Sequence, residues 1–124
     1  MTLAVLPLAL GLTALAQTAS AFGAMDCVGS DYCRTDGCTQ SFMVLGITFD
    51  WTAQSATVEM AGETTRLDLA MNDLSADMSS GALTYINTDN AGMILEFDAQ
   101  GIEMTLYSSD GISHIAACSA REAA

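Results

Sequence analysis

The last third of the chain is dominated by apolar residues that recur at every second position. The pattern includes Leu83 with Tyr85 and continues through residues 93–97 and 102–106. This period places successive apolar side chains on one face of a strand. The pattern is interrupted by glycine-containing segments at residues 89–92, 99–101 and 109–111. These segments predict hairpin turns in which glycine takes a positive φ. Residues 82–118 therefore predict an antiparallel meander.

The middle of the chain shows the same alternation. Odd-numbered residues from Met43 to Trp51 are apolar, which predicts a long strand with one buried face. Residues 56–60 and 67–71 alternate around Gly62-Glu63, which predicts a hairpin with a type II′ turn. The polar segment 72–81 then predicts an exposed loop, and loops of this kind carry function more often than strands do.

The strand pattern predicts an all-β chain with about seven strands. We expect a small antiparallel β-barrel or closed meander, stapled by disulfides, because closure removes the exposed edges that invite aggregation. A sandwich is the alternative closed form. The residues expected inside share one parity on each strand: Leu45, Ile47, Phe49, Trp51, Val58, Leu67, Leu69, Leu95, Phe97, Met104 and Leu106.

The N-terminal segment has the pattern of a signal peptide. Residues 3–16 form an apolar run too short to span a bilayer, and Ala19-Ser20-Ala21 resembles a cleavage site. We predict that residues 1–21 are removed and that the mature protein is periplasmic or secreted, with no membrane contact after cleavage. No Lys or Arg precedes Leu3, so an N-terminal anchor is the competing interpretation.

The chain is strongly acidic, with a formal net charge of −12, and residues 1–21 contribute no charged side chain. This charge disfavours nucleic acid and would attract a basic protein partner over long range. The alternative is that the charge serves only solubility in salty surroundings.

Four cysteines in a small exported chain predict two disulfides. Cys27, Cys33 and Cys38 cluster near the start, so a long-range bridge must join this cluster to Cys118. We favour Cys38 with Cys118 and Cys27 with Cys33. The spacing lacks the paired C-x-x-C geometry of structural zinc sites, so we expect no metal. We expect a cysteine-rich loop over residues 22–40, a β domain over 41–118 and a tail over 119–124.

Residues that could carry catalysis are sparse. His114 is the only histidine, and its place on the last strand favours a structural role. Same-face carboxylates such as Glu96 with Asp98 occur in any chain this acidic, and Asn87 to Gly92 only partly matches a calcium loop, since Ala91 cannot be a ligand. We predict a protein that is not an enzyme and needs no cofactor.

The order of motifs from residue 38 to residue 118 resembles that of a known family. The motifs are Cys38, Phe42 and Val44, Ala56-Thr57-Val58 ahead of Gly62, Ser80-Gly81-Ala82 with Tyr85, Gly101 ahead of Met104-Thr105-Leu106, Gly111 and Cys118. In this order the chain resembles the periplasmic and membrane-bound inhibitors of C-type lysozyme, which are small antiparallel β-barrels.

The resemblance implies a binding role for one loop and one turn. In that family a Ser-Gly-Ala-x-Tyr loop enters the lysozyme cleft, and a Lys before the glycine of a later turn pairs with a carboxylate of the enzyme. The matching positions here are Ser79, Ser80, Gly81, Ala82 and Tyr85, with one extra residue before the tyrosine, while Gln100 stands in place of the Lys. The resemblance thus implies a basic partner such as a C-type lysozyme. The alternative is an exported accessory domain without inhibitory activity.

Overall fold

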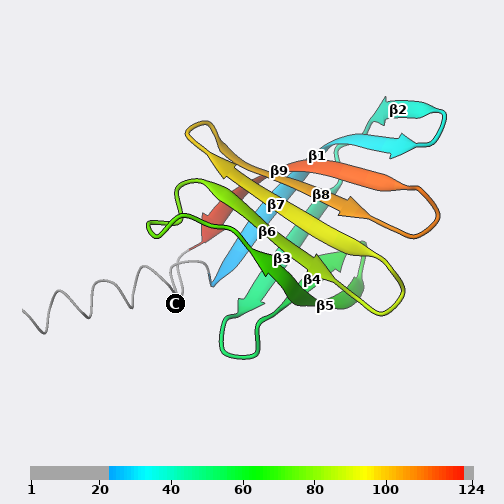
Figure 1. Cartoon of the computed structure of the whole chain (residues 1–124). Coiled ribbons are helices and arrows are strands. Elements are labelled where there is room, and N and C mark those ends of the chain that lie inside the picture. The colour runs from blue at the N-terminus through cyan, green and yellow to red at the C-terminus, as the bar shows by residue number, and fades with distance from the viewer. Residues whose placement is uncertain (1–22, 122–124) are drawn as a thin grey trace, which may run out of the picture.

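The computed structural model describes residues 23–121, which form an antiparallel β-barrel (Figure 1). The strands in this part of the chain are β1 (Ala24–Arg34), β2 (Gly37–Gln40), β3 (Val44–Asp50), β4 (Ser55–Met60), β5 (Glu63–Asn72), β6 (Gly81–Ile86), β7 (Gly92–Asp98), β8 (Gly101–Tyr107) and β9 (Ser113–Arg121). The predicted all-β, closed antiparallel fold is confirmed. The expected signal peptide lies outside the described residues.

The barrel closes because β1 pairs with two neighbours at once. Along β1, residues from Ala24 to Cys33 pair with β9, and residues from Ala24 to Val28 also pair with β3. The remaining strands pair in chain order from β3 to β9. After a bulge between Gly29 and Asp31, the second half of β1 still pairs with β9 as far as Cys33, but its other neighbour is β2 and no longer β3. Figure 1 shows this β1–β2 hairpin projecting from the barrel.

The cysteine-rich segment was predicted wrongly as a loop. Residues 24–34 form β1, a strand whose alternate residues Met25 and Cys27 are fully buried. The alternation is short and lies among cysteines and glycines, so it was hard to recognise in the sequence. The expected tail also begins too early, because β9 continues to Arg121, whose Nε lies 3.0 Å from Oδ2 of Asp26.

The disulfide pairing predicted from the sequence is wrong, although the long-range bridge is confirmed. The structure joins Cys27 to Cys118 and Cys33 to Cys38. Each pair faces across a ladder, β1–β9 for the first and β1–β2 for the second. Cys27 and Cys33 lie on one extended strand, where a separation of about 3.3 Å per residue places them roughly 20 Å apart, too far for a disulfide.

The barrel interior is a continuous apolar core. Of the expected core residues, Trp51, Leu69 and Leu106 are only partly buried and the others are buried. The core residues that the prediction omitted are Met25, Cys27, Ala56, Leu83, Tyr85, Met93 and Ala116. Several of these come from β1 and β9, the strands that close the barrel.

Two turns differ from their prediction. The β4–β5 hairpin turns at Ala61 and Gly62, both with positive φ (52° and 81°), because Met60 pairs with Glu63. Positive φ at both central residues defines a type I′ turn, so the predicted type II′ turn at Gly62-Glu63 is wrong. In the β6–β7 turn Asn90 takes the positive φ, whereas Gly92 lies inside β7.

The two ends of the barrel carry different connections. We call the end with residues 51–54, 73–80 and 99–100 the loop end, and the opposite end, with the turns at residues 61–62, 87–91 and 108–112, the hairpin end. Residues 23–121 contain no helix long and apolar enough to cross a membrane.

Candidate functional sites at the two barrel ends

The β5–β6 loop, residues 73–80, is held together by hydrogen bonds that centre on Ser75. The Ser75 N–H donates to Ser80 O at 2.9 Å, and the Met78 N–H donates to Ser75 O at 2.9 Å. Ser75 Oγ accepts the N–H groups of Ser79 and Ser80, each at 3.2 Å. These bonds give the predicted exposed loop a defined shape.

Asp77 completes this network. Its Oδ1 accepts the hydroxyls of Ser75 at 2.7 Å and Ser79 at 2.6 Å, and the Ser79 N–H at 3.1 Å. These bonds, with that from the Ser79 hydroxyl the strongest, lower the pKa of Asp77 to about 2. The carboxylate therefore stays charged and its hydrogen bonds persist under all but strongly acidic conditions.

Gly81 is required where the loop enters β6. Its φ is 107°, a conformation that side chains with a Cβ rarely adopt, and a Cβ there would lie 2.9 Å from Leu74 Cα. The Asp73 N–H donates to Ala82 O at 2.9 Å across the base of the loop. The motif glycine is therefore explained by the close approach of the two loop strands.

The residues that the resemblance selected do not all face solvent. Ser79 and Ser80 are exposed, and within residues 23–121 the Ser80 hydroxyl has no hydrogen-bond partner, whereas the Ser79 hydroxyl is bound to Asp77. Tyr85 is only 1% exposed and packs 6.1 Å from the Phe49 ring in the core, where burial raises its pKa to about 12. Tyr85 is thus a core residue, because it has the inward parity of β6.

Gln100 lies at the same end of the barrel as the β5–β6 loop. Gly81 pairs with Phe97, and Gln100 occupies the tight turn just after Asp98. The Asp98 carboxylate caps this turn by accepting the N–H groups of Gln100 at 2.8 Å and Gly101 at 3.1 Å. The structure therefore brings Ser80 and Gln100 to one end of the barrel.

An acidic groove of about 290 Å³ extends from Gln100 along the outer face of β7, β8 and β9. Glu96 and Glu103 face each other directly across the β7–β8 ladder, and Asp98 also lines the groove. Among the described residues the ion pairs join Arg66 to Asp68 and Arg121 to Asp26, so neither involves these three carboxylates. Like charges opposite each other on a sheet repel, so this face favours a cationic partner.

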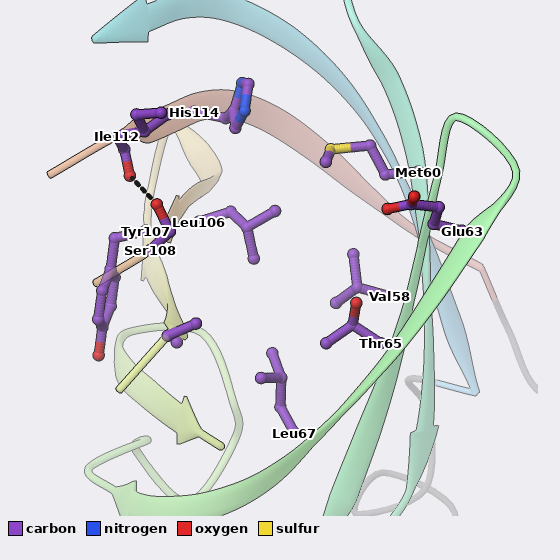
Figure 2. A pocket seen from close by; sticks show the side chains of 12 residues that line it. Val58, Met60, Glu63, Thr65, Leu67, Leu106, Tyr107, Ser108, Ile112 and His114 are labelled. Carbon is purple, nitrogen blue, oxygen red and sulfur yellow. Dashed lines mark hydrogen bonds between the residues drawn. The ribbon is translucent and has the colours of Figure 1, made fainter. Parts of the chain in front are cut away.

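A cavity of about 180 Å³ lies at the hairpin end, on the inner side of the barrel wall. Figure 2 shows the side chains of Val58, Leu67 and Leu106 directed into it from β4, β5 and β8. Glu63 and Thr65 line it from the first half of β5. That half pairs only with β4, because the β5–β6 ladder begins at Asp68. The barrel wall is therefore incomplete beside the cavity.

His114 is the polar group that distinguishes this cavity. It lines the cavity from β9, and its Nδ1 is buried without a hydrogen-bond partner within the described part of the chain. Its ring lies 4.9 Å from the ring of Tyr32, its cross-strand partner on β1. Burial lowers the pKa of His114 below its ordinary value of 6.5, so the imidazole is neutral at physiological pH.

The sequence prediction missed this cavity. His114 was expected to have only a structural role on the last strand, and its shared parity with apolar Ile112 and Ala116 was the signal that could have indicated an inward-facing polar group. The open wall beside β5 could not be predicted, because it depends on how far the β5–β6 ladder extends.

Comparison with known proteins identifies no relatives: no family model, no curated protein and no solved structure matches this chain significantly.

Proposed function

We propose that the protein is an exported binding module that blocks a basic cell-wall hydrolase of the C-type lysozyme kind. The observation that supports this most is the ordered β5–β6 loop, which presents the Ser80 hydroxyl at the same barrel end as the Gln100 turn and the acidic groove. A loop that is already ordered loses little conformational entropy on binding. The two disulfides of the protein are compatible with an oxidising compartment, as expected for an exported protein.

In the proposed complex, one surface feature contributes to affinity and another raises the association rate. The Ser80 hydroxyl donates a hydrogen bond to a carboxylate in the enzyme cleft, as the family resemblance implies. The carboxylates of Glu96, Asp98 and Glu103 attract the cationic surface of the enzyme and accelerate association. Gln100 provides no cation, so inhibition is weaker than in a relative with Lys at this position.

An inhibition assay against a C-type lysozyme tests the proposal. Ser80→Ala removes a hydrogen bond to a charged group, worth about 1.5–3 kcal/mol, and should weaken inhibition by about tenfold or more. Ser109→Ala is the matched control, because Ser109 is an exposed serine at the hairpin end and should have no effect. Gln100→Lys should strengthen inhibition by adding the cation.

Salt dependence separates specific blocking from charge attraction. Charge attraction alone should vanish as ionic strength rises, whereas the Ser80 effect should persist at about 0.15 M salt, where the screening length is about 8 Å. The proposal fails if the wild-type protein at micromolar concentration leaves lysozyme active at that salt. It also fails if Ser80→Ala and Ser109→Ala inhibit equally.

A further inference from the structure

The hairpin-end cavity is a recess, open beside β5, that combines space for a ligand with a buried hydrogen-bonding atom that has no partner among the described residues. Buried polar atoms nearly always have a partner, yet Nδ1 of His114 has none among residues 23–121. Their coincidence indicates a site for a ligand.

The size of the cavity limits the ligand to a single small ring. Its volume of about 180 Å³ is slightly larger than that of an engineered apolar cavity of about 150 Å³ that binds benzene. Val58, Leu67 and Leu106 supply apolar walls, which favour a hydrocarbon body. A larger ligand would have to extend through the incomplete wall beside β5.

The polar groups limit the chemistry of the ligand further. The carboxylate of Glu63 at the rim and the net charge of −12 disfavour an anion. A neutral imidazole uses one nitrogen as donor and the other as acceptor, and a hydroxyl group can satisfy Nδ1 in either role because it both donates and accepts. An ammonium group would find its carboxylate partner, Glu63, at the exposed rim and not among the apolar walls, so the inner part of the cavity favours a neutral ligand.

We propose that the hairpin-end cavity binds a small, neutral, hydroxylated ring compound such as a phenol, with its hydroxyl on Nδ1 of His114 and its ring among Val58, Leu67 and Leu106. The ligand enters through the gap beside the unpaired half of β5, where Thr65 is exposed. This site lies at the barrel end opposite Ser80 and Gln100, so it does not depend on the proposed inhibition.

Phenol and toluene are suitable probes, because they share a ring and differ in the hydroxyl group. His114 is the only histidine of the chain, so its ring proton resonances report on the site without ambiguity. Phenol should shift these resonances saturably in the oxidised wild-type protein. A shift that stays linear up to the solubility limit of phenol would overturn the proposal, and this measurement requires no variant.

A pair of variants locates the binding site. Thr65→Phe places a ring in the cavity from an exposed strand position and should abolish binding of both probes. Thr64→Phe introduces the same ring one residue away on the outer face, since Thr64 pairs with exposed Glu59, and should leave binding unchanged. Equal affinity of both variants for phenol would place the ligand elsewhere and overturn the proposal.

A third variant tests the hydrogen bond. His114→Phe keeps a ring at this position and removes Nδ1, so the affinity for phenol should fall by roughly twofold to tenfold, which corresponds to one neutral hydrogen bond. Toluene affinity, measured by calorimetry, should not fall. If His114→Phe weakens both probes by the same factor, the hydroxyl does not bind Nδ1 and the assigned ligand class is wrong.

Discussion

Removing the two disulfides separately should cost very different amounts of stability. Cys27 and Cys118 are 91 residues apart in sequence, whereas Cys33 and Cys38 are 5 apart. In the chain-entropy model the first bridge contributes about 4.6 kcal/mol to the free energy of unfolding and the second about 2 kcal/mol. The double variant Cys27→Ala/Cys118→Ala also loses buried sulfur packing, because Cys27 is fully buried.

The expected consequence is a large difference in melting temperature. For a domain of this size, 1 kcal/mol shifts the midpoint by about 4–8 °C, so the long-range double variant should melt about 20 °C or more below wild type. The short-range variant Cys33→Ala/Cys38→Ala should melt about 8–16 °C below it. Urea denaturation should rank the two variants in the same order of stability. The m-value should rise most for the long-range variant, because its unfolded chain expands most.

Peptide mapping of the disulfides checks which cysteines are paired. Cleavage before aspartate separates Cys27 from Cys33 at Asp31 and separates Cys33 from Cys38 at Asp36, so peptides linked through each bridge can be identified by mass. The reasoning is refuted if both double variants lose equal stability, or if the short-range variant loses more. Peptides that link Cys38 to Cys118 would refute the pairing itself.

Two further perturbations test particular contacts. Between its lowered folded pKa and 6.5, His114 binds more protons in the unfolded chain than in the folded one, so the free energy of unfolding should rise with pH through this window. His114→Phe should remove that rise in urea denaturation experiments from about pH 5 to pH 8. If the free energy of unfolding of the variant rises with pH as steeply as that of wild type, the burial argument is contradicted. A Cβ at Gly92 would lie 2.6 Å from both Tyr107 Cζ and Tyr85 O, so Gly92→Ala should destabilise the protein by about 1–3 kcal/mol. Gly46→Ala is its control, because the nearest atom to a Cβ there is 4.0 Å away, and equal losses in thermal denaturation would show that Gly92 is not tightly packed.

The sequence by itself determined the strands after residue 43 and eight of the fifteen buried core residues. Alternation at period two is a local property, so Ile47, Val58 and Leu95 could be assigned to the core without knowing which strands are neighbours. A closed fold was also expected from the sequence, since a strand-rich chain without helical periodicity has exposed edges to protect, but the choice between barrel and sandwich stayed open. The loop at residues 73–80 was predictable for the same reason, because it interrupts the alternation with polar residues.

Only the tertiary structure decided which distant residues meet. Cysteine spacing is compatible with several pairings, and the choice of Cys27 for Cys118 depends on the β1–β9 register. A motif match cannot separate Ser80, which faces solvent, from Tyr85, which the barrel buries. The opening beside the His114 cavity exists because the β5–β6 ladder stops at Asp68, and the extent of a ladder is set by packing between strands rather than by either strand alone.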